Sequence, residues 1–103
     1  MSELLRFSSE SLVDIENLHA HIAQHQIPAR AYKIASRIRV AINRLTTFPE
    51  MGRLGRVQGT RELIIGGLPY LAVYELQDDR VIILRVLHTS QHWPPEEVGD
   101  AVE

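Results

Sequence analysis

Residues 59–94 constrain the fold of this chain more than any other part of the sequence. They read GTRELIIGGLPYLAVYELQDDRVIILRVLHTSQHWP and contain three short runs rich in β-branched and aromatic residues. The pairs Gly66-Gly67 and Asp78-Asp79 separate these runs, and both are typical of tight turns. The pattern predicts three antiparallel strands over residues 60–65, 70–76 and 80–87. The last run is apolar enough to lie inside a sheet.

Two amphipathic helices are predicted ahead of these strands. Ser8 and Ser9 are good N-cap residues, because a serine oxygen can accept an unpaired backbone N–H, and the helix that follows should end near His25. Pro28 suits the first turn of a second helix, which Pro49 ends. So short a link predicts an antiparallel hairpin. The apolar stripes expected to be buried are Leu12, Ile15, Leu18 and Ile22, and then Ala31, Ile34, Ile38, Ala41, Ile42, Leu45 and Phe48.

The order of these elements defines the expected fold class. A short apolar run at residues 4–7 predicts a first strand. We therefore expect an α+β fold with an N-terminal strand and an antiparallel helix hairpin. The hairpin should pack on a small, mainly antiparallel sheet of three to four strands. With 103 residues, the chain is expected to form one domain over 1–95, followed by an acidic, flexible tail over 96–103.

Composition excludes several classes of site. The chain has no cysteine, so it has no disulfide framework, thiolate zinc site or cysteine nucleophile. No run of about 18 apolar residues or signal-peptide pattern is present, so we expect a cytoplasmic protein without a membrane partner. The formal net charge of −2 argues against direct nucleic-acid binding, except through local charge asymmetry. No pattern calls for a cofactor or a metal.

One charge asymmetry lies on the outer side of the second helix. The simplest interpretation is a solvated face partly paired with Glu10, Asp14 or Glu16, since surface ion pairs contribute only about 0–1 kcal/mol. The alternative is a surface that attracts an acidic partner. This basic strip consists of Arg30, Lys33, Arg37 and Arg44.

Two patterns match known ligand sites only in part. His21 and His25 share a helix face at i,i+4 but lack the glutamate of an H-E-x-x-H site, so a solvent-facing pair is favoured over a metal site. The glycines Gly52, Gly55 and Gly59 have no preceding strand and no following Lys-Ser/Thr, so the phosphate-loop pattern fails.

Three arginines lie in or beside this glycine-containing loop: Arg53, Arg56 and Arg61. Guanidinium groups bind phosphate or carboxylate in bidentate fashion, so the three together are candidates for contacting a target. A solvated loop, or a structural role that fixes the loop to the sheet, is the alternative.

A second cluster, His88, His92 and Trp93, follows the last predicted strand. A histidine near neutral pKa beside Arg85 could act as a general acid–base on RNA. However, strand alternation places Arg85 and His88 on opposite faces, so the two need not converge. Trp93 is more often a lid over the core than a platform for stacking. Read from residue types alone, the sequence supports a small α+β binding domain.

The order of segments nevertheless resembles the RelE/ParE superfamily of bacterial toxins along nearly the whole chain. The resemblance is carried by FSSESLVDI at residues 7–15, FPxxGR at 48–53, GTREL at 59–63, PYLAVY at 69–74, RVLH at 85–88 and QHWP at 91–94. It implies a toxin of a type II toxin-antitoxin system, neutralised by an antitoxin encoded beside it in a toxin–antitoxin hetero-oligomer.

The superfamily contains ribosome-dependent messenger-RNA endonucleases, like RelE, and ParE-like toxins, understood to poison DNA gyrase. The resemblance implies that the nucleases place cations at four positions where this chain has Glu62, Ile64, Leu71 and Gln91. Phosphate chemistry needs such cations to stabilise developing charge. The ParE-like branch, a non-enzymatic toxin, is therefore expected. A nuclease, the alternative, would use Arg61, Arg85 and His88.

Two binding surfaces follow as expectations. The target, expected to be DNA gyrase, would be contacted by Arg53, Arg56, Arg61, His88, His92 and Trp93. The antitoxin would be contacted by the basic strip, which would suit an acidic antitoxin segment. A helix hairpin against a sheet also offers grooves and an edge strand to a disordered partner.

Overall fold

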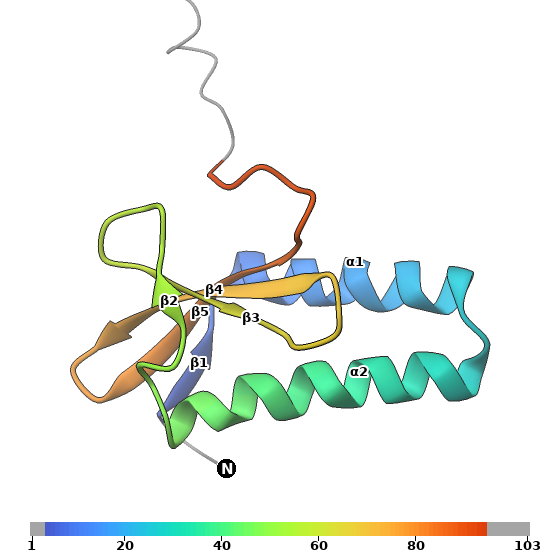
Figure 1. The fold of residues 1–103 in the computed structure, drawn as a ribbon, viewed down its shortest axis with the longest axis horizontal. Helices are drawn as coiled ribbons and strands as arrows, with labels where there is room; N and C mark the ends of the chain where they lie inside the picture. Colours follow the sequence, from blue (N-terminus) through green and yellow to red (C-terminus); the bar gives the residue numbers. More distant parts are fainter. Residues whose placement is uncertain (1–3, 95–103) are drawn as a thin grey trace, which may run out of the picture.

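The computed structural model describes residues 4–94, so the acidic tail predicted over 96–103 lies outside the described residues. A helix hairpin packs on a small sheet, and the far ends of both helices extend past the strands (Figure 1). The elements are β1 (Leu5–Phe7), α1 (Ser9–His25), α2 (Pro28–Asn43), the 3₁₀ turn η1 (Arg44–Thr46), β2 (Arg53–Leu54), β3 (Arg61–Ile64), β4 (Tyr70–Gln77) and β5 (Arg80–His88).

The sheet has the strand order β1-β5-β4-β3-β2. β1 pairs parallel to β5, whereas the other neighbours are antiparallel. The predicted α+β class and the interior position of β5 are confirmed. The five strands exceed the predicted three to four because β2 extends the sheet by pairing Arg53 with Glu62 and Leu54 with Arg61. β2 has only two residues, too few to show a periodic pattern in the sequence, so its formation depends on pairing with β3.

Local chemistry sets both helix starts and the end of α1 close to where the sequence predicts them, whereas α2 ends before the predicted Pro49. The Ser8 hydroxyl caps α1 by accepting a hydrogen bond from the Ser11 N–H at 3.0 Å, and Gln26 is the C-cap. α2 begins at Pro28, as predicted, but its α-helical geometry ends at Asn43 and continues as a 3₁₀ turn. No helix among residues 4–94 is both long and apolar enough to cross a membrane.

The core lies between the hairpin and one face of the sheet. Leu18, Ile22, Ile38 and Ile42 from the helices meet strand residues such as Tyr74 there. Two stripe predictions are wrong, because Leu12 and Phe48 are each 54% exposed. At the start of α1 the buried position is Ser11, whose small side chain donates to the Ser8 carbonyl. Phe48 follows the 3₁₀ turn, where the helical period that would have buried it has ended.

Candidate functional surfaces

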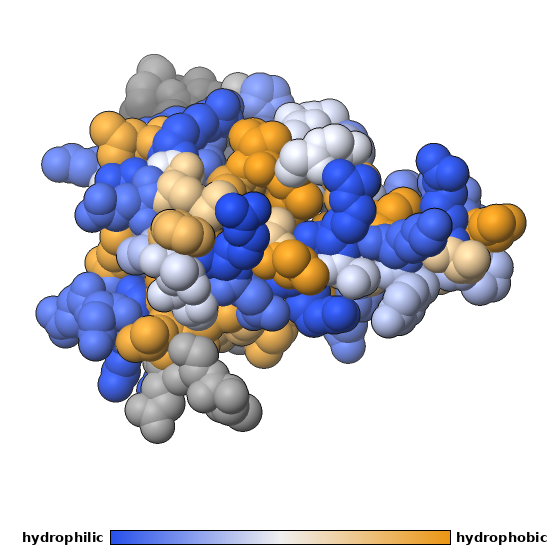
Figure 2. Space-filling view, turned by 60° about the horizontal axis from the view of Figure 1, so that its bottom comes forward, coloured by the Kyte–Doolittle hydropathy of each residue, from blue (hydrophilic) through white to orange (hydrophobic). Residues whose placement is uncertain are grey.

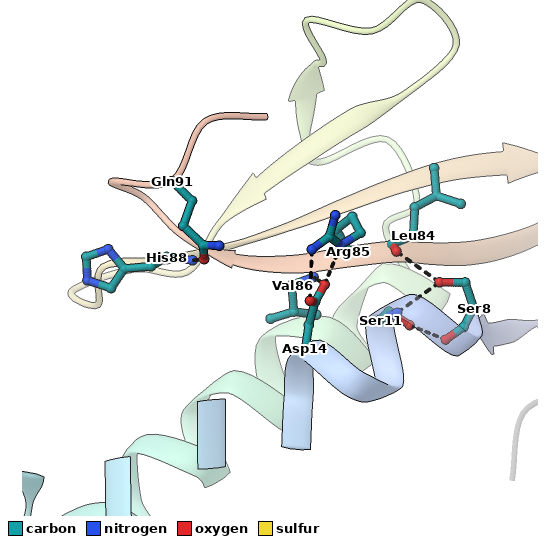
Figure 3. A network of polar contacts seen from close by, with 8 residues as sticks. All are labelled: Ser8, Ser11, Asp14, Leu84, Arg85, Val86, His88 and Gln91. Carbon is teal, nitrogen blue, oxygen red and sulfur yellow. Dashed lines mark hydrogen bonds and ion pairs between the residues drawn. The ribbon is translucent and has the colours of Figure 1, made fainter. Parts of the chain in front are cut away.

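Arg85 on β5 forms an ion pair with Asp14 on α1. Arg85 donates from Nε to Asp14 Oδ2 at 2.6 Å and from Nη2 to Asp14 Oδ1 at 3.0 Å (Figure 3). The same carboxylate accepts the Val86 N–H at 3.0 Å. The hydrogen bonds that Arg85 donates to Asp14 raise the pKa of Arg85 above its usual value. Arg85 therefore stays charged and is occupied by a partner from the helix.

Trp93 lies against this ion pair instead of closing the core between the helices. The Arg85 guanidinium carbon is 5.5 Å from the centroid of the indole ring, within the range of a cation–π contact. The indole Nε1 is buried and has no hydrogen-bond partner among the described residues. The contact fixes the segment that leaves β5 over the guanidinium.

His88 occupies a different environment from Arg85. Its Nδ1 lies 2.7 Å from the Ser90 hydroxyl, and its ring meets Tyr70 edge-on at 5.5 Å between centroids. In Figure 3 the imidazole points away from the guanidinium. The register of β5 shifts opposite Val73 and Tyr74, ahead of Arg85, and is regular from Arg85 to His88. Alternation therefore holds between these two residues, and their predicted separation is confirmed.

A cavity of about 400 Å³ lies between α1 and the ends of β4 and β5. His88, Tyr70 and His21 line it, together with Asn17 and Gln91. The Gln91 amide oxygen accepts the His88 backbone N–H at 2.8 Å. Of the residues predicted to contact the target, His88 lines this open cavity. His92 is exposed outside it.

The loop arginines surround Glu62, a residue whose role the sequence analysis missed. Arg53 donates to Glu62 Oε1 from Nη2 at 2.9 Å and from Nε at 3.2 Å, and the Arg56 backbone N–H donates to Oε2 at 3.2 Å. Glu62 is only 4% exposed. Burial alone would raise the pKa of this carboxyl, but the hydrogen bonds from Arg53 and Arg56 outweigh it and hold the pKa below its usual value.

Arg61 ties the same loop to the sheet. Its Nη1 donates to the Gly52 carbonyl at 2.8 Å and to the Glu50 carbonyl at 3.1 Å. The Tyr74 hydroxyl donates to the Pro49 carbonyl at 2.7 Å and accepts the Gly52 N–H at 2.9 Å. A Cβ at Gly52 would lie 2.7 Å from that hydroxyl, so the approach requires glycine. These contacts support the structural interpretation of Arg53 and Arg61, whereas the side chain of Arg56 remains exposed.

Beside this anchored loop, the strand register brings three apolar residues into one row. Ile64 pairs with Leu71, and Leu71 pairs with Leu87, across β3, β4 and β5. Paired residues point to the same face of a sheet, and here that face is opposite the helices. Ile64 is 44% exposed, whereas Leu87 is buried. The aliphatic surface that this row presents to solvent is therefore that of Ile64, with Leu71 partly exposed beside it.

The basic strip, on α2 and at Arg44 of η1, is exposed, and the pairing expected from Glu10, Asp14 or Glu16 is wrong. Asp14 pairs with Arg85, and the described residues contain no ion pair to the strip. Arg37 instead donates to the Gly66 carbonyl at 2.5 Å. Hydrophobic patches interrupt the hydrophilic surface on this side of the molecule (Figure 2).

The histidine pair on α1, His21 and His25, is in contact along the helix. His25 Nδ1 lies 2.8 Å from the His21 carbonyl, and the two rings lie 4.3 Å apart between centroids. Among residues 4–94, no group of three or more His, Cys, Asp or Glu side chains is placed to hold a metal ion.

Comparisons with known proteins identify the family. A profile described as the ParE toxin of the type II toxin-antitoxin system parDE matches residues 5–93. The toxin candidate Y4kP of Sinorhizobium fredii is 34% identical over 90 residues, covering 87% of this chain and 92% of that protein. Toxin RelE2 of Caulobacter vibrioides is 32% identical over 81 residues, covering 79% and 89%.

Solved structures share the fold. A chain from the chromosomal ParDE system of P. aeruginosa superposes with a TM-score of 0.73 at 22% identity, covering 82% of this chain and 92% of that chain. The conserved hypothetical protein HP0894 of Helicobacter pylori matches with a TM-score of 0.50 at 20% identity, covering 84% and 94%. Together with the profile match, these relatives show that the chain belongs to the ParE toxin family of type II toxin-antitoxin systems, within the RelE/ParE superfamily.

Proposed function

We propose that this toxin acts in the cytoplasm without catalysis, by binding DNA gyrase, and that the antitoxin its family implies neutralises it. The observation that carries the proposal is the replacement of cations on the sheet face opposite the helices. At three positions where the resemblance implies cations in the nucleases of the superfamily, this chain has the buried, ion-paired Glu62 and the apolar residues Ile64 and Leu71.

The remaining arginines support the same proposal. A nuclease must hold a scissile phosphate and stabilise its added charge with available cationic groups. Arg85 is engaged by Asp14, and Arg61 by two backbone carbonyls. Recruiting either to a phosphate would break contacts that hold α1 or the loop to the sheet. A surface of aliphatic and anchored polar groups suits binding to a protein better than phosphate chemistry.

The alternative is an RNA endonuclease, and one observation favours it. His88 borders the 400 Å³ cavity beside Tyr70 and His21, so a side chain able to transfer protons lines a concave surface. General acid–base catalysis by a histidine contributes typically about 10²–10⁴-fold to a rate. If this cavity were the active site, His88→Ala would abolish toxicity while leaving the fold and antitoxin binding intact.

Induction in cells separates the two functions. Gyrase poisoning predicts a DNA-damage response and filamentation while messenger RNA stays intact. A nuclease predicts rapid arrest of translation with cleaved messenger RNA. Cleaved transcripts appearing before any DNA-damage response, and lost in His88→Ala, would replace the gyrase proposal with the nuclease.

We place the antitoxin on the basic strip, because cations without acidic partners suit an acidic segment. Reversing Arg30, Lys33 and Arg37 together to glutamate should weaken antitoxin binding at low salt. The control reverses Arg6 and Arg80, which are exposed on other elements. Equal affinity of the strip variant and the wild type at low salt would rule out this placement.

A further inference from the structure

The open cavity of about 400 Å³ beside α1 is lined by neither the basic strip nor the exposed Ile64. Part of its lining is apolar, formed by the buried residues Leu18 and Val86 and by Tyr70. The other lining residues are polar and come from α1, the end of β5 and the turn that follows it. They are Asp14, Asn17, His21, His88, Ser90 and Gln91. A small ligand with a flat apolar body and polar edges fits such a lining.

Tyr70 brings an unused polar group to this cavity. The residue is only 8% exposed, and its hydroxyl forms no hydrogen bond among the described residues. Within residues 4–94, the only fully buried side-chain nitrogen or oxygen without a partner is Trp93 Nε1, so the Tyr70 hydroxyl reaches open space. A buried tyrosine usually finds a partner for its hydroxyl. Here that group is free to bond a ligand.

The contacts of His88 decide which of its ring nitrogens carries the proton. The Ser90 N–H donates to His88 Nδ1 at 3.1 Å, so Nδ1 is an acceptor. The Ser90 hydroxyl lies 2.7 Å from the same nitrogen and can donate to it as well. The proton of the neutral ring is therefore on Nε2. His88 thus offers a ligand an N–H donor, whereas a general base would need an unprotonated nitrogen there.

Two side-chain amides border the same space. The Asn17 amide forms no hydrogen bond within the part of the chain that the structure describes. The Gln91 amide keeps its NH₂ group, because only its oxygen is engaged, by the His88 backbone N–H. An asparagine or glutamine amide pairs in bidentate fashion with the N6 and N7 edge of adenine. The cavity therefore contains the side chains that recognise this base.

His21 adds an aromatic surface. Its ring lies 4.3 Å between centroids from the ring of His25, which does not line the cavity. His25 thus covers one side of the His21 ring and leaves the other side to a planar ligand. Nucleobases stack on aromatic side chains, histidine included.

The charge of the lining disfavours a phosphate group. No lysine or arginine is among the described residues that line the cavity, and Asp14 contributes a carboxylate that Arg85 already pairs. Nucleic acids bind proteins largely through contacts of lysine and arginine with phosphates. The cavity therefore suits a neutral nucleoside better than a nucleotide or an RNA strand.

We propose that this cavity binds a free purine nucleoside whose base is adenine. The base stacks on His21, its N6–N7 edge pairs with the Asn17 amide, and the ribose hydroxyls bond Tyr70 and His88. This inference goes beyond the proposed function and does not depend on the gyrase target.

Isothermal titration calorimetry of the purified toxin with adenosine tests the site. We expect saturable binding that Tyr70→Phe and Asn17→Ala each weaken at least about fivefold, because each removes a hydrogen-bonding group from the ligand. Tyr70→Phe should keep the fold, since the hydroxyl bonds no described residue. Asn43→Ala is the matched control, because Asn43 is also an exposed helical amide but lines a different cavity. It should change the affinity by less than about twofold.

Altered ligands test what the cavity recognises. Inosine, which carries a carbonyl in place of the N6 amino group, should bind at least about fivefold more weakly than adenosine. AMP should bind no tighter than adenosine, because the lining offers its phosphate no cation.

The proposal is overturned if adenosine does not bind, if Asn43→Ala and Asn17→Ala lose equal affinity, or if inosine binds as well as adenosine. Tighter binding of AMP or of single-stranded RNA would also overturn it, and would assign the cavity to a phosphate-bearing ligand. Gyrase inhibition, measured without nucleoside, reports separately on the gyrase proposal.

Discussion

At the scale of single residues, two acidic side chains, Glu62 and Asp14, hold Arg53 and Arg85 in ion pairs within the fold. Glu62 draws in Arg53 and the Arg56 N–H, and Asp14 draws in Arg85 and the Val86 N–H. A carboxylate that accepts several hydrogen bonds from cations and amides is well compensated for partial burial. Arg53 and Arg85 are residues of a type that binds phosphate, but here both form contacts that stabilise the fold.

Glu62 should give the protein a defined acid sensitivity. Its pKa is lowered in the folded state, so its contribution is present above the ordinary value of 4.5 and is lost as the pH falls through the folded value. We expect Glu62→Gln to lower the free energy of unfolding by about 1–3 kcal/mol at neutral pH. The difference from wild type should shrink at pH 3. Urea unfolding at both pH values measures this, and a loss that grows on acidification would contradict it.

The three hydrogen bonds that Asp14 accepts should stabilise the folded protein. Asp14→Asn removes the charge opposite Arg85 while keeping the shape, and we expect a loss of about 1–3 kcal/mol in urea unfolding. Glu16→Gln on the same helix is the control, because Glu16 is exposed and should change stability by less than about 0.5 kcal/mol. Equal stability of the two variants would mean that the Asp14–Arg85 pair does not hold α1 to β5.

At the scale of elements, the loop before β3 is the part whose order depends most on one side chain. The Tyr74 hydroxyl bridges the Pro49 carbonyl and the Gly52 N–H from the middle of β4. This bridge positions β2, because Arg53 directly follows Gly52. The sheet thus acquires its fifth strand through a tyrosine of its central strand.

Tyr74→Phe tests this dependence. The variant leaves a buried N–H unpaired, so we expect a loss of about 1–3 kcal/mol and faster amide exchange at Gly52. Tyr70→Phe is the matched control, since Tyr70 is also buried in the core but its hydroxyl makes no hydrogen bond among the described residues. Unchanged exchange at Gly52 in Tyr74→Phe would show that the loop is ordered by other contacts.

The same elements explain what could be predicted from sequence. Ser8, Pro28 and the turn pairs act through their immediate neighbours, so they marked the helix starts and strand ends correctly. β2, by contrast, exists through its pairing with β3, which local patterns do not encode.

In the candidate site, too, features set by local patterns could be predicted, whereas those set by long-range contacts could not. Glu62 was read as a missing cation, because only the fold reveals that Arg53 and Arg56 surround it. Leu12 was assigned to the core by period, whereas the approach of α1 to the sheet edge buries Ser11 in its place. The separation of Arg85 from His88 was predictable, but the partner of each was not.

At the scale of the whole molecule, the two candidate binding surfaces lie on different sides. The α2 side is basic and grooved, which suits an acidic antitoxin. The sheet face opposite the helices carries the exposed Ile64 and the partly exposed Leu71 beside the anchored loop, which supports the proposal of a protein target. Because the two surfaces are separate, variants of one should leave binding at the other intact.

The measurement that tests the central claim most directly is inhibition of purified DNA gyrase by the purified toxin. Supercoiling of relaxed plasmid is followed with and without antitoxin, while ribosome-bound messenger RNA is assayed in parallel with the same preparation. The account predicts inhibition that antitoxin reverses, that His88→Ala retains, and that occurs without RNA cleavage. Uninhibited gyrase together with cleaved messenger RNA, abolished by His88→Ala, would contradict it.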